Sequence, residues 1–395
     1  MQLWKIKFSI SFMKRLIFLV ILFSGCAVFT PLKKSRLISV FHLIETNKFE
    51  DAKGLVEEMI EDEEASQWPR TWYARGLLSQ TAYREGMQRN NRKLFELYPD
   101  QLFVAIESYE KARELDTRGR LERQLAPRYI LLANDFQKLG EKHFSENKYK
   151  EALRAFEQAL EITQSPLLAV KTDTNLIYNT ALAAYEARKW EKSIKYFNIL
   201  HDYRHSVNAT HLLFTSYLEK GDTIAAELVL SEGVNNFNFH EDLVLLLADL
   251  LFITDDKEGA IEILQEAATE HPENHLFPFT KGLIYQKSSM YENAIESYKK
   301  AIELNPEELR AYLNIATCYY NIGVQIDESA RTITMISLVQ EERARSAEAF
   351  DSAVKWLDKV FEKEPDDQEI LSQLYQLYKT LRVNDRLQSI EDQRN

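Results

Sequence analysis

Residues 275–308 read HLFPFTKGLIYQKSSMYENAIESYKKAIELNPEE and carry the pattern that decides the fold. Small residues stand at Gly282, Ala294 and Ala301, and large residues such as Tyr298 fall between them. Small residues recur at matching positions 34 and 68 residues earlier: Ala260, Ala267, Ala226 and Gly233. A fixed period of this length predicts stacked helical hairpins, each of which buries its apolar face against its neighbours.

The spacing between the first two positions of this pattern is constant along the chain. It is twelve residues in five units: Gly140 to Ala152, Ala181 to Ser193, Phe214 to Ala226, Ala248 to Ala260, and Gly282 to Ala294. Small side chains let helix backbones approach closely, and large side chains fill the space between them. Pro272, Pro306 and Pro365 each follow the expected end of a second helix, which proline cannot continue.

These units resemble the tetratricopeptide repeat, whose 34-residue pattern has the same small and aromatic positions. The resemblance implies an all-α fold, a right-handed α-solenoid of about eight stacked helix-turn-helix hairpins over residues 36–390. Two units are too long, which predicts insertions near 88–104 and 322–346. We expect the second insertion to consist of extended helices that overshoot the stack. An apolar stripe that includes Leu371 and Tyr378 predicts a closing helix over 368–390.

The N-terminus has the features of an export signal. Lys14 and Arg15 precede the apolar run 16–23, which is too short to cross a bilayer because a spanning helix needs about 20 residues. Leu22-Phe23-Ser24-Gly25-Cys26 resembles a bacterial lipobox, although Phe23 stands where leucine is usual. The resemblance implies that residues 1–25 are a lipoprotein signal peptide and that Cys26 carries the lipid.

The remaining expectations for this region follow from that resemblance. Met13 is a conventional start, and residues 26–35 would form a short tether. The arrangement resembles lipoproteins of the Bacteroidetes type, and no acidic residue follows Cys26 closely. We therefore expect a lipid-anchored protein of the bacterial cell envelope, on the outer membrane and facing the periplasm.

Composition and motifs argue against several functions. The net charge of −12 argues against binding to nucleic acid. The glycines form no phosphate loop, nucleophile elbow or dinucleotide fingerprint, so we expect neither catalysis nor a cofactor. His201 and His205 have the i, i+4 spacing of metal ligands but lie at a helix end without further ligands, and we predict no metal site. Cys318 is expected to be a buried apolar residue.

The candidate binding site is the concave groove that first helices line in this repeat family. Exposed aromatic side chains in a groove suit capture of a peptide or helix, because they offer large contact areas at low entropic cost. Seven aromatic residues occupy groove positions 5 and 12: Tyr73, Phe144, Tyr178, Tyr185, Phe252, Phe279 and Tyr320. The alternative is that about half of them are buried between adjacent first helices. The Lys and Asn with which chaperone-type members hold a peptide carboxylate are absent, as Gln137 and Glu141 illustrate.

The sequence thus predicts a non-catalytic scaffold that binds protein or peptide partners in the cell envelope and reaches the membrane through its lipid anchor. It leaves the partner and the oligomeric state open. Two alternatives remain. One is a glycan-binding lipoprotein of nutrient uptake, in which the insertions carry the sugar site. The other is an α/α-barrel carbohydrate-active enzyme, which would need a converging pair of carboxylates.

Overall fold

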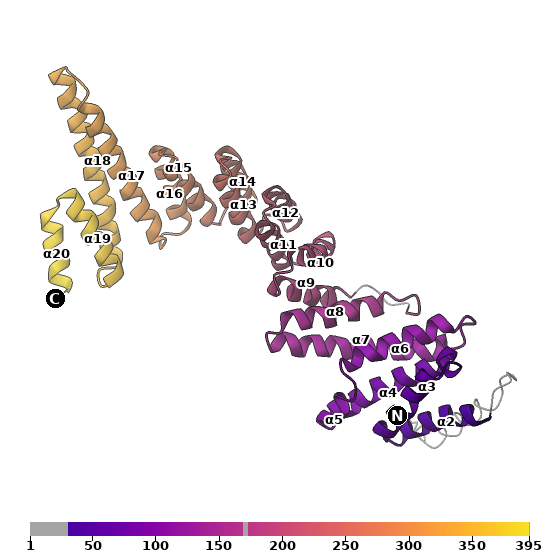
Figure 1. Ribbon diagram of the computed structural model, residues 1–395. Coiled ribbons are helices and arrows are strands. Elements are labelled where there is room, and N and C mark those ends of the chain that lie inside the picture. Colours follow the sequence, from indigo (N-terminus) through magenta and orange to yellow (C-terminus); the bar gives the residue numbers. More distant parts are fainter. Residues whose placement is uncertain (1–30, 169–172, 395) are drawn as a thin grey trace, which may run out of the picture. The chain divides into compact units, whose positions relative to one another are not determined.

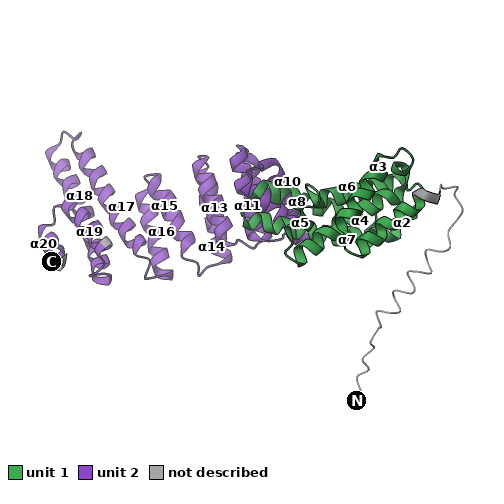
Figure 2. Ribbon diagram, turned by 60° about the horizontal axis from the view of Figure 1, so that its bottom comes forward, with its two compact units in different colours: residues 1–172 green, residues 173–395 purple. Residues whose placement is uncertain are grey.

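The computed structural model describes residues 31–168 and 173–394. The chain forms two compact units, residues 1–172 (unit 1) and 173–395 (unit 2), which are described separately (Figure 2). The expected signal peptide over residues 1–25 and the lipidated Cys26 lie outside the described residues. All described elements are helices, and they follow one another as antiparallel pairs (Figure 1). The predicted all-α architecture of stacked helix pairs, a solenoid of tetratricopeptide type, is therefore confirmed.

Unit 1 contains three of these pairs. The first is α2 (Pro31–Glu45) with α3 (Phe49–Glu61), followed by the short 3-10 helix η1 (Ala65–Gln67). The second is α4 (Pro69–Gln88) with α6 (Gln101–Leu115), between which lies α5 (Arg92–Phe95). The third is α7 (Glu122–Ser145) with α8 (Tyr149–Thr163). Because α2 begins at Pro31, part of the tether expected over 26–35 is helical.

Unit 2 continues the same arrangement from α9 to α20. Its pairs are α9 (Thr174–Glu186) with α10 (Trp190–Asp202), α11 (Val207–Lys220) with α12 (Thr223–Asn236), α13 (Glu241–Ile253) with α14 (Lys257–Glu270), α15 (Leu276–Lys287) with α16 (Tyr291–Leu304), and α17 (Leu309–Ala330) with α18 (Ile336–Lys363). The chain then forms α19 (Gln368–Leu381) and α20 (Asn384–Arg394).

The turns inside the pairs follow from local chemistry. Asn147 adopts a left-handed backbone with φ of 58° between α7 and α8, a conformation that asparagine tolerates better than most residues. The aromatic residue that opens the second helix packs on the end of the first: the rings of Phe144 and Tyr149 are 5.2 Å apart, and those of Tyr185 and Trp190 are 5.6 Å apart. Gly221, with φ of 85°, ends α11 as its left-handed C-cap.

The repeat pattern is a packing rule between the two helices of each pair. A Cβ on Gly140 would lie 2.6 Å from the ring of Phe156, and a Cβ on Gly76 would lie 2.6 Å from the ring of Tyr109. Real Cβ atoms do not come so close, so only glycine lets these rings lie flat against the first helix. The small positions are therefore the places where the second helix presses its aromatic residue onto the first.

The two long units depart from the repeat in different ways. Residues 88–104 hold α5 and a loop, which folds back: Lys53 Nζ donates to the Leu97 carbonyl at 2.6 Å, and Tyr98 donates to Glu57 at 2.7 Å. Residues 322–346 lie mainly in α17 and α18, which extend well past α15 and α16 (Figure 1). This extension keeps the packing rule, since a Cβ on Gly323 would lie 2.7 Å from the Phe350 ring.

Two boundaries differ from the expectation. The closing region is two helices, α19 and α20, where the sequence predicted one over 368–390, because Arg382 takes a left-handed backbone with φ of 58° that ends α19. Helix α7 is longer than the repeat that contains Gly140 requires, since it begins at Glu122 and carries Pro127 inside it. The extra turns of α7 bury Leu125 and Tyr129.

Candidate functional site

Two of the seven predicted groove residues are core residues. Tyr73 is 8% exposed and packs its ring 5.9 Å from that of Tyr109. Phe279 is 5% exposed, lies 5.6 Å from the ring of Tyr298, and is covered by the guanidinium of Arg310 at 4.8 Å. The expectation that Tyr73 and Phe279 are exposed is wrong, because an aromatic residue of the second helix packs against each of them. The alternative of burial between helices applies to these two.

Phe144 and Tyr320 are half-buried against their own helix pairs. Phe144, in unit 1, meets Tyr149 edge-on at 5.2 Å. Tyr320, in unit 2, lies 5.7 Å from Phe350 in the extension of α18. Each retains part of its surface.

Tyr178 joins two repeats of unit 2. Its ring stacks on His205 at 5.5 Å with an interplanar angle of 20°, and its hydroxyl accepts a hydrogen bond of 2.7 Å from Asn208 Nδ2. His205 is therefore engaged with an aromatic ring, while His201 is buried between Thr210 at 3.4 Å and Glu232 at 3.1 Å. The two histidines do not face one another as metal ligands would. Tyr178 is half-buried and acts first as a contact between α9 and α11.

The remaining predicted residues belong to an apolar row near the C-terminal ends of the first helices. It consists of Tyr185 on α9, Leu218 on α11, and Phe252 with Ile253 on α13, and we call it the first-helix face. Tyr185 and Phe252 are half-buried, whereas Leu218 is 37% exposed and Ile253 is 77% exposed. Leu218 and Ile253 were missed in the sequence because only aromatic residues were sought. Their repeat positions, 12 and 13, were the available signal.

Some first helices of neighbouring pairs touch one another. Helices α9 and α11 contact each other directly, as do α13 and α15. Among the described residues of unit 2, second helices of neighbouring pairs do not meet to the same extent.

Acidic side chains surround the row. Burial raises the pKa of Tyr185, and the carboxylates of Glu186 and Glu219 raise it further, so both carboxylates lie near its hydroxyl. Asp249 is exposed on α13, one helical turn before Phe252. At the far end of the row, the ammonium group of Lys287 on α15 lies 5.2 Å from the centre of the Phe252 ring. The site therefore combines exposed apolar surface with uncompensated negative charge.

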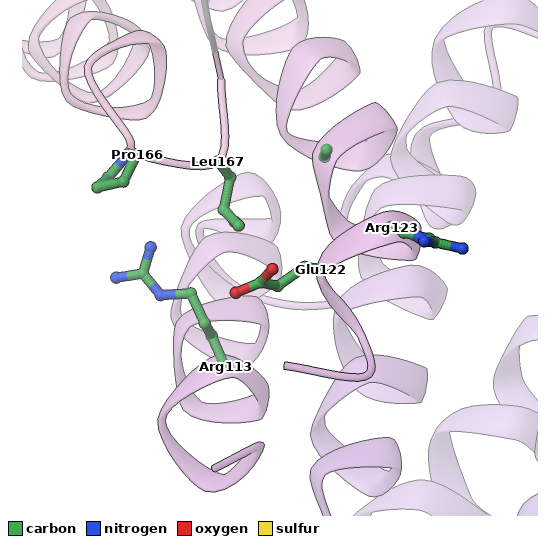
Figure 3. A pocket seen from close by; sticks show the side chains of 6 residues that line it. Arg113, Glu122, Arg123, Pro166 and Leu167 are labelled. Atoms are coloured by element: carbon green, nitrogen blue, oxygen red, sulfur yellow. The ribbon is translucent and has the colours of Figure 1, made fainter. Parts of the chain in front are cut away.

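The described residues offer little support for a site of another kind. One open cavity of about 500 Å³ lies in unit 1, where Arg113, Glu122 and Leu167 gather and Arg123 extends away from them (Figure 3). It contains none of the predicted residues, and its charged walls are exposed side chains. Within residues 31–168 and 173–394, no three His, Cys, Asp or Glu side chains come together in a way that could hold a metal ion.

The insertions differ from what a sugar site would require. Loop 88–104 is held against α3 by the bonds of Leu97 and Tyr98. The tip between α17 and α18 exposes Met335, Ile336 and Leu338 and contains no aromatic residue for stacking on a sugar. Among the helices described, none combines the length and the apolar character needed to cross a membrane.

Comparison with known proteins finds the tetratricopeptide repeat in one part of this chain. Residues 279–308 match the family model of the tetratricopeptide repeat. Curated relatives include a peroxisomal targeting signal receptor of Candida glabrata, 28% identical over 30% of this chain and 22% of the receptor. A human protein O-mannosyl-transferase, TMTC1, is 25% identical over 60% of this chain and 26% of its own length. Hsp70-Hsp90 organizing protein 2 of Arabidopsis thaliana is 22% identical over 60% and 42%. The chain thus spans about a quarter of the length of the first two of these relatives.

Two of the solved structures that resemble this chain are the following. A crystal structure of a TPR repeats protein from Bacteroides fragilis is 18% identical, with a TM-score of 0.36 over 63% of this chain and 98% of that one. The crystal structure of MamA is 20% identical, with a TM-score of 0.32 over 48% and 98%.

Proposed function

We propose that this protein, a scaffold of tetratricopeptide repeats, holds a segment of a protein partner on the first-helix face of unit 2. The observation that carries the proposal is the row formed by Tyr185, Leu218, Phe252 and Ile253: Tyr185 and Phe252 are half-buried and Leu218 and Ile253 are exposed, whereas Phe279 on the next first helix is buried. Large side chains that are already partly held in place offer contact area to a partner. Ordering them on binding costs little entropy. Proteins of this repeat class bind protein and peptide partners.

Two further considerations support a non-catalytic role. The perturbed tyrosines of unit 1, such as Tyr83 and Tyr98, are buried core groups, and burial is the leading cause of the raised pKa in both. The relatives with the clearest names, a targeting signal receptor and a chaperone-organizing protein, are named for handling other proteins. This chain spans 22% and 42% of the length of those relatives. Their names therefore support a general role in binding proteins and no particular partner.

The proposed location is the bacterial cell envelope, with the chain anchored through lipid on Cys26. Support for it comes from the sequence: a charged start, a short apolar run and the lipobox-like residues 22–26. Two or more acyl chains hold a protein on a bilayer stably, whereas a single chain is marginal. A scaffold held in this way would collect its partner at the membrane surface.

A pair of double variants tests the binding site. Tyr185→Ser with Phe252→Ser should reduce recovery of the partner that the wild-type chain crosslinks to in intact membranes, with helical content unchanged. The matched control is Ile224→Ser with Leu228→Ser, which removes apolar side chains that are 85% and 59% exposed on α12, a second helix. Loss of the crosslinked product in the control alone would place the partner on the second helices and would contradict the proposal.

A further inference from the structure

The first-helix face is acidic over a defined stretch. On α9, α11 and α13 the inward repeat positions 2, 5, 9, 12 and 13 hold four carboxylates, Glu186, Glu219, Asp242 and Asp249, and no lysine or arginine. The first cations at these positions are Lys287 on α15 and Arg310 on α17. Negative charge therefore extends over three successive first helices and stops where Lys287 covers Phe252.

Three of these acids have no counter-ion in the described structure. Glu186, Glu219 and Asp249 are exposed, and none forms an ion pair with a described cation. Some acids on other surfaces are paired, as Glu303 is with Lys300 at 2.9 Å and Asp327 with Arg331 at 2.7 Å. Like charges placed side by side without partners cost free energy, and a cationic ligand would relieve that cost while apolar contacts are made.

From this charge pattern we infer that the partner segment is basic and apolar, with lysine or arginine side chains for Glu186, Glu219 and Asp249 and apolar side chains for Tyr185, Leu218 and Phe252. The inference rests on the proposed function and specifies its partner. It excludes an acidic segment, which these three carboxylates would repel.

The geometry of the stack also limits the spacing of the cations. Packed helices lie about 8–10 Å apart, and an extended chain advances about 3.3 Å per residue. Glu186 on α9 and Glu219 on α11, two first helices that contact each other, therefore match basic residues about three positions apart in an extended segment that runs across the helices. Apolar residues between them would meet the row that begins at Tyr185.

The probe that follows is a labelled peptide, acetyl-(Lys-Ser-Leu)3-amide, titrated against the full chain by fluorescence anisotropy at low salt. We expect saturable binding that weakens as salt is raised. The triple variant Glu186→Gln, Glu219→Gln, Asp249→Asn should lower the affinity about tenfold or more and flatten the salt dependence. The same peptide with glutamate in place of lysine should not bind.

A control of equal charge separates the site from the net charge of the chain. Glu262→Gln, Glu266→Gln, Glu296→Gln removes three exposed acids from α14 and α16, which are second helices, and should leave the affinity unchanged. Equal losses in both triple variants, no binding by the wild type, or equal binding of the glutamate peptide would each overturn the inference.

Failure of this inference can be told apart from failure of the proposed function. If the triple acid variant still crosslinks its natural partner fully while Tyr185→Ser with Phe252→Ser does not, the binding face is right and the basic chemistry is wrong. If neither variant affects the natural partner, the face itself is wrong.

Discussion

Gly282 and Tyr298 are in such close contact that a methyl group on the glycine would lie 2.6 Å from Cε1 of the tyrosine ring. Tyr298 is fully buried there, and its hydroxyl donates a hydrogen bond of 2.6 Å to Gln286 Oε1 on the same first helix as the glycine. The contact limits how closely α15 and α16 approach each other. Gly140 with Phe156 and Gly76 with Tyr109 make the same kind of contact in their own pairs.

Gly282→Ala should therefore lower the melting temperature. The added methyl group overpacks the Tyr298 ring, which costs about 1–3 kcal/mol, and this outweighs the gain of about 1 kcal/mol in helix propensity. Gly54→Ala is the matched control, because a Cβ at Gly54 in α3 meets nothing within 4 Å. Circular dichroism should show the control to be as stable as the wild type or more so. Equal effects of the two changes would refute the packing rule.

Glu308 should make the junction of α15 and α17 sensitive to acid. Hydrogen bonds from Arg310, at 2.6 and 2.8 Å, hold the pKa of this carboxyl below its ordinary value of 4.5, with a further contact from His275. A lowered pKa in the folded state means that the carboxylate stabilises the fold above pH 4.5 and that this stabilisation is lost as the pH falls through the lowered value.

Glu308→Gln should thus melt below the wild type at pH 7, and the difference should close as the pH falls from 4.5 through the lowered pKa of Glu308. Glu303→Gln removes an exposed carboxylate paired with Lys300 and should change the melting temperature little at either pH. A gap between wild type and Glu308→Gln that stays constant from pH 7 to pH 3 would show that the carboxylate charge is not the cause.

Cys318 should be unreactive in the native protein. Its side chain is fully buried, and burial, with a smaller contribution from Glu292, raises the pKa of the thiol to about 12. Because the thiolate is the reactive form, a Cys26→Ser chain should not react with Ellman's reagent at pH 8 until it is unfolded in urea. Rapid labelling without urea would mean that α17 opens readily around this residue.

Substitution of the other cysteine tests the anchor. Cys26→Ser should move the protein from the detergent phase to the aqueous phase in a Triton X-114 partition, because the acyl chains can no longer be attached. Cys318→Ser is the matched control and should partition like the wild type. If Cys26→Ser stays in the detergent phase, the lipoprotein proposal is wrong.

The sequence predicts the helix pairs well because the small residues report direct contacts. Gly140 and Gly282 are glycine since an aromatic ring occupies the place of their Cβ, so a periodic search finds them. The exposure of the groove residues could not be predicted in the same way. Phe252 and Phe279 are both aromatic and both on first helices, but Phe279 lies against Tyr298 and beneath Arg310, whereas Phe252 has only Lys287 over its ring.

The boundaries that differed depend on single residues without a periodic signal. Arg382 takes a left-handed conformation that no sequence pattern marks, and it divides the closing region into α19 and α20. The early start of α7 depends on Leu125 and Tyr129, which find an apolar surface on the preceding pair. The start of α7 is thus set by a tertiary contact rather than by local preference.

The pair α19 and α20 has a consequence for growth of the array. A stack of like units carries at its end an apolar face that another unit would cover, and such a face could add copies one after another into a filament. Here Leu371, Leu374 and Tyr378 occupy that place, packed with Tyr312 and Leu357 of the preceding pair in one core cluster. This face of the α17–α18 pair is already filled by its own chain, and polymerisation through it is blocked.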